Sequence, residues 1–213
     1  MTNPSINRDA SATILGYLFQ FDATILAILR LKENSEILVE GVEDFDLRSG
    51  NLADLFQCKY YAASKLTPAI LRDAIIPMLK GFSKMKPGER DSTTYHLYGY
   101  FRGSTPGPLK FSVQDVKNAL VRRERTKNNV GSTHLIEVNV QNELGISDYD
   151  LSIFVQNLSV VITPEYSKHK ETVIDALKVG LRVSLDEARN FLYPSAQTFV
   201  ANLSSKREKA KRT

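Results

Sequence analysis

The fold is decided by Glu40-Gly41-Val42-Glu43-Asp44-Phe45-Asp46 and by Gln57-Cys58-Lys59-Tyr60-Tyr61, which begins eleven positions after Asp46. Because the first stretch follows Ile37-Leu38-Val39, we expect a strand from Glu36 to Leu47 and a second strand from Asp54 to Tyr61. Side chains alternate along a strand. Asp44 and Asp46 are therefore expected on one face, Gln57 and Lys59 together on one face of the neighbouring strand, and Cys58 towards the core.

These side chains have the chemistry needed for metal-dependent phosphodiester cleavage. Carboxylate and amide oxygens suit Mg²⁺, which keeps several of its waters and uses only one or two protein carboxylates. A divalent ion held by Asp44 and Gln57 would lower the pKa of a bound water and offset the charge that grows on the phosphate. Lys59 could orient or deprotonate that water, or bind the scissile phosphate. We therefore expect Mg²⁺ or Mn²⁺ as the cofactor.

Three motifs in order resemble the PD-(D/E)XK nuclease superfamily, in its variant with glutamine before the lysine. They are Gly16-Tyr17-Leu18-Phe19-Gln20 on a first helix, Glu40 to Asp44, and Gln57-Cys58-Lys59. The pattern is most similar to the N-terminal Cap-type and Mrr-like endonuclease domains of bacterial anti-phage defence effectors. The resemblance implies a DNA endonuclease that is activated through oligomerisation or through a fused or associated sensor module.

The same resemblance implies roles for individual residues. Asp44 matches the metal-binding aspartate, Gln57 the second metal ligand and Lys59 the catalytic lysine. Gln20 matches a helix residue that supports the site, and Glu40 is a ligand or a supporting carboxylate. Asp46 is a further candidate metal ligand that could exchange roles with Asp44. The chain has Gln57 where the superfamily commonly has an acid, which should weaken metal affinity without abolishing it.

The expected fold class is α/β, a restriction-endonuclease-like core with a central mixed sheet flanked by helices and a largely helical C-terminal half. Helices are expected from Ala10 to Leu31 and after Thr67-Pro68, and a strand from Thr93 to Arg102. In the second half, Ser112, Ser147 and Ser184 are expected to begin helices, Ser159 to Thr163 to be a strand or a buried segment, and Tyr193-Pro194 to interrupt a helix. The expected units are a nuclease core over 1–110, a helical extension over 111–205, and a basic tail or linker over 206–213.

The composition is that of a folded domain with a moderately basic charge. The formal net charge is +4 and the isoelectric point about 9.1, which suits a nucleic-acid partner. The basic cluster expected to contact DNA is Arg122, Arg123, Arg125 and Lys127. A single cysteine excludes a disulfide framework, no apolar run is judged long enough to span a bilayer, and no signal peptide is recognisable, so the cytoplasm is the expected compartment. Two alternatives stay open: a catalytically silent nuclease-like scaffold, and a nuclease that acts on RNA.

Overall fold

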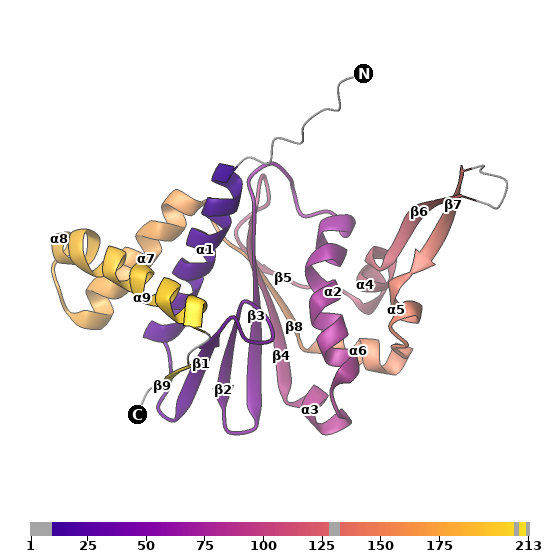
Figure 1. Cartoon of the computed structure of the whole chain (residues 1–213), viewed down its shortest axis with the longest axis horizontal. Helices are drawn as coiled ribbons and strands as arrows, with labels where there is room; N and C mark the ends of the chain where they lie inside the picture. The colour runs from indigo at the N-terminus through magenta and orange to yellow at the C-terminus, as the bar shows by residue number, and fades with distance from the viewer. Residues whose placement is uncertain (1–9, 128–132, 207–208, 212–213) are drawn as a thin grey trace, which may run out of the picture.

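A mixed sheet forms the centre of the protein. The computed structural model describes residues 10–127, 133–206 and 209–211. The strands lie in the order β5-β8-β4-β3-β2-β1-β9 (Figure 1). Their bounds are β1 Ser35–Val39, β2 Phe45–Ser49, β3 Leu52–Tyr61, β4 Thr93–Phe101, β5 Gly107–Leu109, β8 Leu158–Ile162 and β9 Lys209–Lys211. Strands β3, β4 and β8 are parallel, and the other pairings are antiparallel. The expected α/β class is confirmed.

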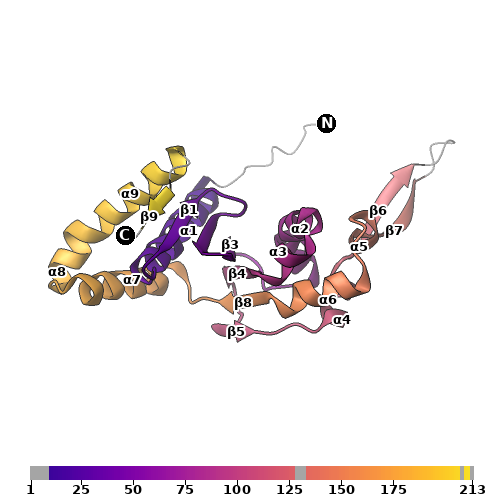
Figure 2. The same ribbon diagram turned by 90° about the horizontal axis from the view of Figure 1, so that it is seen from below.

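Helices cover both faces of this sheet (Figure 2). On one side, α1 (Ala10–Leu29) packs on β3 and against α7 (Tyr166–Leu181) and α9 (Tyr193–Lys206). On the other side, α2 (Pro68–Lys84) lies with α4 (Val113–Ala119) and α6 (Asp148–Gln156) over β4. Strand β4 still alternates between buried and partly exposed residues, and its buried side chains face α2. The start of α2 is as expected, because the Thr67 hydroxyl accepts a hydrogen bond from the Ile70 N–H at 3.3 Å.

Helix α1 is a core helix, although its sequence also has the length and apolar composition of a membrane span. The span Ser11–Leu29 is longer and more apolar than the sequence analysis recognised. The buried side chains of this span include Phe19, Ile25 and Leu26. They pack against the sheet and against α7, so tertiary packing accounts for the apolar character of α1.

The segment expected to be one strand from Glu36 to Leu47 is a hairpin instead. Strands β1 and β2 pair antiparallel from Ser35↔Ser49 to Val39↔Phe45, and residues 40–44 form the turn between them. Asp44 therefore lies before β2, whereas Asp46 lies within it, and the expectation that the two share one strand face is wrong. The expectation for β3 is confirmed, since Cys58 packs in the core beneath α1 with Phe19.

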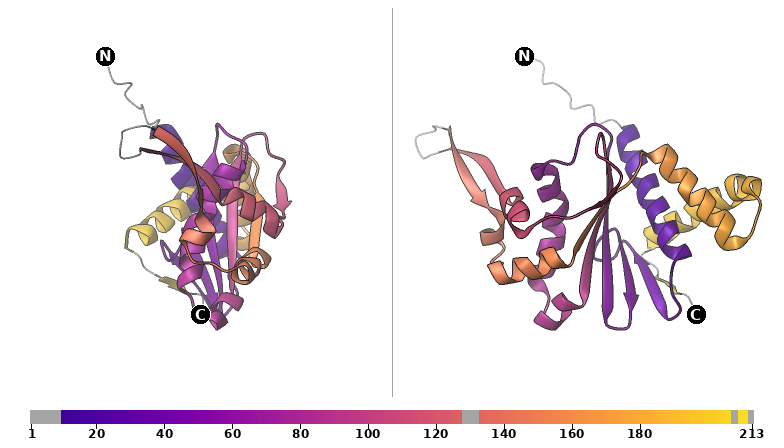
Figure 3. Two further views of the ribbon diagram at one scale, coloured as in Figure 1. Left: turned by 90° about the vertical axis from the view of Figure 1, so that its right-hand side faces the viewer. Right: turned by 180° about the vertical axis from the view of Figure 1, so that it is seen from behind.

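The C-terminal half contains more strand than expected. Residues 158–162 form β8, which lies between β4 and β5 in the sheet. Strands β6 (Val121–Lys127) and β7 (Thr133–Asn139) form a two-stranded arm that projects away from the sheet (Figure 3). Segment 111–205 is thus not only helical, because it supplies a strand of the central sheet and this arm.

The predicted helix starts in this half are confirmed. The hydroxyls of Ser112, Ser147 and Ser184 accept hydrogen bonds from backbone N–H groups three residues later. The interruption expected at Tyr193 is a π-helical turn, η1 (Ala188–Leu192), which leads directly into α9. The remaining short helices are α3 Pro87–Asp91, α5 Val140–Glu143 and α8 Leu185–Glu187.

Candidate active site

The turn between β1 and β2 is held together by the buried carboxylate of Asp46. Its oxygens accept hydrogen bonds from the N–H of Val42 at 3.1 Å and the N–H of Glu43 at 3.3 Å. Gly41 lies so close that an added Cβ would stand 2.5 Å from Asp46 Oδ2, so only glycine fits there. Asp46 is fully buried. Its observed contacts are these hydrogen bonds, which support the turn, and a 3.5 Å ion pair with Arg48. Its role as a metal ligand stays a prediction.

The turn places Asp44 over the unpaired edge of β3. The pairing of β2 with β3 ends at Phe45↔Phe56, so the last part of β3 has no strand on this side. Asp44 Oδ2 accepts a hydrogen bond from the backbone N–H of Cys58 at 2.6 Å and another from Gln57 Nε2 at 2.7 Å. An unpaired N–H group at this edge is thereby satisfied by a carboxylate rather than by another strand.

Helix α1 supports the other end of the turn. Gln20, which is largely buried, donates a hydrogen bond from Nε2 to Glu40 Oε1 at 2.9 Å. Glu40 has a φ of +55°, in the left-handed region that a residue with a Cβ adopts only at some cost. Gln20 therefore fixes a carboxylate on a strained backbone at the start of the turn that carries Asp44, and the supporting roles of Gln20 and Glu40 stay predictions.

Burial and, to a smaller extent, neighbouring charges raise the pKa of two carboxyl groups in the turn, Asp44 and Glu43. Burial raises the pKa of Asp44, although the Cys58 N–H, Lys59 and Gln57 act in the opposite direction. Burial, followed by the charges of Asp44 and Asp46, raises the pKa of Glu43 to about 7. The charge of Lys59 lowers both pKa values, so Lys59 lies near both carboxyls, but burial acts more strongly and both pKa values stay raised.

Glu43 is the site residue that sequence reasoning quoted but gave no role. It is almost completely buried beside Asp44 and Asp46, and it lines the same hollow as Asp44 and Gln57. Its position next to Asp44 in the acidic run was the available signal. The run alone does not reveal that the turn folds inwards and buries this particular side chain.

The donor atoms fit a hard divalent cation. Asp44, Gln57, Glu40 and Glu43 line one hollow of about 690 Å³, and Oδ1 of Asp44 takes no part in the hydrogen bonds to Cys58 and Gln57. One or two carboxylates with an amide oxygen and water match the preference of Mg²⁺. Across residues 10–127, 133–206 and 209–211, no group of three or more His, Cys, Asp or Glu side chains could hold a metal ion. The fit therefore depends on the mixed set of carboxylate, amide and water.

A second, smaller hollow of about 260 Å³ brings Lys59 to the same place. It is lined by Asp44, Cys58, Lys59 and residues of α1, including Tyr17 and Gln20. The predicted residues Gln20, Glu40, Asp44, Gln57 and Lys59 thus come together from a helix, a turn and a strand. Helix α1 and the turn between β1 and β2 meet at the unpaired edge of β3, and the hollows there open to solvent.

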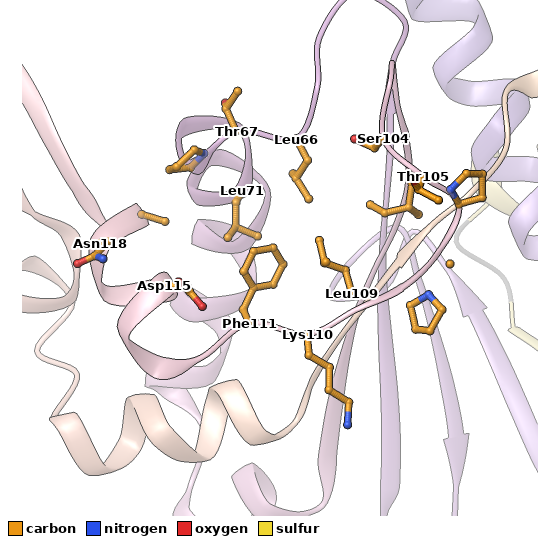
Figure 4. A pocket seen from close by; sticks show the side chains of 16 residues that line it. Leu66, Thr67, Leu71, Ser104, Thr105, Leu109, Lys110, Phe111, Asp115 and Asn118 are labelled. Carbon is orange, nitrogen blue, oxygen red and sulfur yellow. The ribbon is translucent and has the colours of Figure 1, made fainter.

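The largest hollow described lies elsewhere. It measures about 740 Å³ and is formed by the start of α2, the loop that leads into β5, and α4 (Figure 4). Leu71, Leu109 and Phe111 line it, with Asp115 and Lys110 at its border. It shares no residue with the acidic turn or with Lys59.

The basic cluster expected to bind nucleic acid lies on β6, in the projecting arm. Arg122 forms ion pairs with Glu124 at 2.9 Å and Glu143 at 3.3 Å. Arg123 pairs with Glu137 on β7 at 3.2 Å, Arg125 is exposed, and the backbone of Lys127 ends the strand. The arm projects beyond α2, away from the sheet, whereas the acidic turn lies over β3, so the structure does not bring the two together (Figures 1 and 2). Neighbouring carboxylates also reduce the positive charge of the arm.

Comparisons with known proteins identify a structural likeness only. No protein family and no curated protein matches the sequence. The fold is similar to that of a Cap4 SAVED/CARF-domain containing receptor from Moraxella osloensis, with a TM-score of 0.51 and 12% sequence identity over 90% of this chain. The chain spans 44% of the length of that receptor. At this level of identity, the likeness establishes that the two proteins share a fold.

Proposed function

We propose that this chain is a metal-dependent DNA endonuclease and the effector domain of a bacterial anti-phage defence protein. The observation that carries the proposal is the convergence of Asp44, Gln57 and Lys59 at the open edge of β3, with a 2.7 Å hydrogen bond between Asp44 and Gln57. The three residue types were expected together because phosphodiester hydrolysis needs oxygen ligands beside a cation. The defence role rests on the sequence resemblance and on the shared fold with the Cap4 receptor.

The residues have separable tasks in this proposal. Asp44 and Gln57 would hold Mg²⁺ or Mn²⁺, with Glu43 and Glu40 beside them on the same hollow. The cation supplies a water of lowered pKa and offsets charge on the phosphate. Lys59 would orient that water or bind a non-bridging phosphate oxygen, and its charge would stabilise the transition state. Gln20 keeps Glu40 in place through its 2.9 Å hydrogen bond.

An associated sensor module is also part of the proposal. The structural neighbour is a receptor that contains a SAVED/CARF domain, and it is more than twice as long as the present chain. We propose that this chain likewise works with a sensor module, joined to it or separate, and that the module controls cleavage by clustering the nuclease domains.

The test is a cleavage assay on plasmid and linear DNA, at high protein concentration, with Mg²⁺ or Mn²⁺ and with EDTA. We expect cation-dependent cutting by the parent chain and a loss of at least about 100-fold in Lys59→Ala and Asp44→Ala, in the range seen when a general base or an electrostatic stabiliser is removed. Lys178→Ala is the matched control, because Lys178 is exposed near the end of α7. Cutting that survives both site variants would refute the assignment. An RNA of the same sequence tests the RNA-directed alternative, and a chain that never cuts DNA or RNA favours the scaffold.

A further inference from the structure

Tyr17 is the aromatic side chain at the junction of the two hollows of the site. It lines the acidic hollow, together with Glu43, and also the smaller hollow, together with Lys59. Asp44 is the other residue that lines both hollows. Helix α1 turns Gly16, Tyr17 and Gln20 towards the site, because residues three and four apart share one face of a helix. Tyr17 therefore stands beside Asp44 on the path between the acidic turn and Lys59.

The ring of Tyr17 is exposed and belongs to no aromatic cluster in the part of the chain that is described. Its side chain is 56% exposed. Within residues 10–127, 133–206 and 209–211 its ring stacks on no other ring, and its hydroxyl has no hydrogen-bond partner. The nearby Tyr60 is different, since its ring lies 5.6 Å from Phe19 and 5.1 Å from Tyr100, as core packing requires. The ring of Tyr60 is therefore part of the aromatic core, whereas the exposed ring of Tyr17 can contact a bound molecule.

The charges on either side of Tyr17 indicate how a nucleotide would lie. The acidic hollow repels phosphate unless a cation is bound there, and Lys59 attracts phosphate on the other side. A polynucleotide whose phosphate lies between Asp44 and Lys59 must place a neighbouring sugar and base against the wall of the groove. Tyr17 offers a flat, exposed ring on that wall, and aromatic rings bind bases of any sequence by stacking.

We propose that Tyr17 is a substrate-positioning residue whose ring stacks on the nucleotide next to the scissile phosphate. The inference rests on the proposed nuclease function and deepens it, because it identifies the part of the polynucleotide that the chain recognises beside the phosphate. Recognition by a single ring is independent of base identity, so the site should cut with little sequence preference at this nucleotide.

Binding is measured with DNA oligonucleotides that carry 2-aminopurine, with Ca²⁺ in place of Mg²⁺ to hold back cleavage. Stacking on an aromatic ring quenches 2-aminopurine and contributes about 1–3 kcal/mol per base, which corresponds to about a 5- to 150-fold change in Kd. We expect Tyr17→Ala to weaken binding by a factor in this range and to lose the quenching, while Tyr17→Phe retains both. Tyr149→Ala, at an exposed tyrosine of α6, should bind like the parent.

Cleavage kinetics with Mg²⁺ complete the test. We expect Tyr17→Ala to lower kcat/KM with the Phe variant near the parent, and its thermal unfolding should be unchanged because the ring is exposed. The inference would be overturned if the parent cuts DNA and Tyr17→Ala binds DNA, quenches 2-aminopurine and cuts as well as the parent. That result would leave the nuclease assignment intact. A parent that neither binds nor cuts the oligonucleotides would overturn both.

Discussion

Replacing Asp46 separates the two roles open to its carboxylate, support of the turn and metal binding. Two backbone N–H groups, those of Val42 and Glu43, donate to it at 3.1 and 3.3 Å. A hydrogen bond to a charged group contributes about 1.5–3 kcal/mol. Because Val42 is half-exposed and water can reach its N–H, the lower value applies. Asp46→Ala should therefore lower the free energy of unfolding by about 3 kcal/mol, and Asp46→Asn, which keeps one accepting oxygen, by about half of that.

The assay is urea or thermal unfolding of both variants in EDTA, so that no cation contributes. For a chain of this size, about 3 kcal/mol corresponds to a fall in Tm of about 6–12 °C. Asp91→Ala is the matched control, because Asp91 is an exposed aspartate at the end of α3. The order of stability should be parent and Asp91→Ala, then Asp46→Asn, then Asp46→Ala.

The opposite sign would refute this reasoning. The charge of Asp46 raises the pKa of Glu43, whereas the 3.5 Å ion pair of Asp46 with the partly exposed Arg48 contributes little. An Asp46 without a supporting role would therefore mainly repel Glu43 in the metal-free protein. Removing it would then leave the free energy of unfolding unchanged or raise it, and would weaken metal binding in a calorimetric titration. That pair of results would identify Asp46 as a metal ligand first and a support of the turn second.

Two further perturbations test other parts of the structure. Burial beside the rings of Phe19 and Tyr98 lowers the pKa of His169 to about 4, so the unfolded state takes up the proton first as pH falls below about 6.5. When the pH falls from 8 to 5, the free energy of unfolding of the parent should decrease by about 2 kcal/mol more than that of His169→Phe. Urea unfolding at both pH values measures this difference, and an equal decrease in the two proteins would contradict the lowered pKa of His169. Glu40→Gly and Glu40→Ala both remove the carboxylate that accepts the hydrogen bond of Gln20, so both should lower cleavage, but only glycine relieves the positive φ of +55°. We therefore expect a higher Tm for Glu40→Gly than for Glu40→Ala, and equal Tm values would contradict backbone strain at this position.

Strand β3 could be predicted from the sequence because it obeys a simple period. Apolar and aromatic residues surround Gln57 and Lys59, and the alternation of faces gives the orientation of Cys58 correctly. The same rule failed for residues 36–47. Gly41 in an acidic run marks the turn of a hairpin, but its need for glycine comes from the close approach of Asp46, a contact that only the folded hairpin contains.

The burial of acidic groups and the pairing of basic ones are equally hard to read from sequence. Glu43 is buried because the turn folds over β3 and Val42 packs towards α2. Val42 comes so close to this helix that a Cβ added to Gly81 would lie 3.8 Å from the Val42 side chain. Arg123 is neutralised by Glu137, fourteen residues away across the β6–β7 arm. Charge counted along the chain measures neither effect, because both depend on which segments become neighbours.

The division of the site between a rigid strand and a held turn has a consequence for its chemistry. Gln57 and Lys59 lie on β3, which is paired along its length with β4 and cannot shift easily. Asp44 lies on the turn, and its position depends on the hydrogen bonds of the turn to Asp46 and on its own to β3. The carboxylates repel one another, so the arrangement is least favourable when no cation is present. Contacts that hold the turn therefore maintain, without bound metal, a geometry in which a divalent cation could be received beside a fixed lysine.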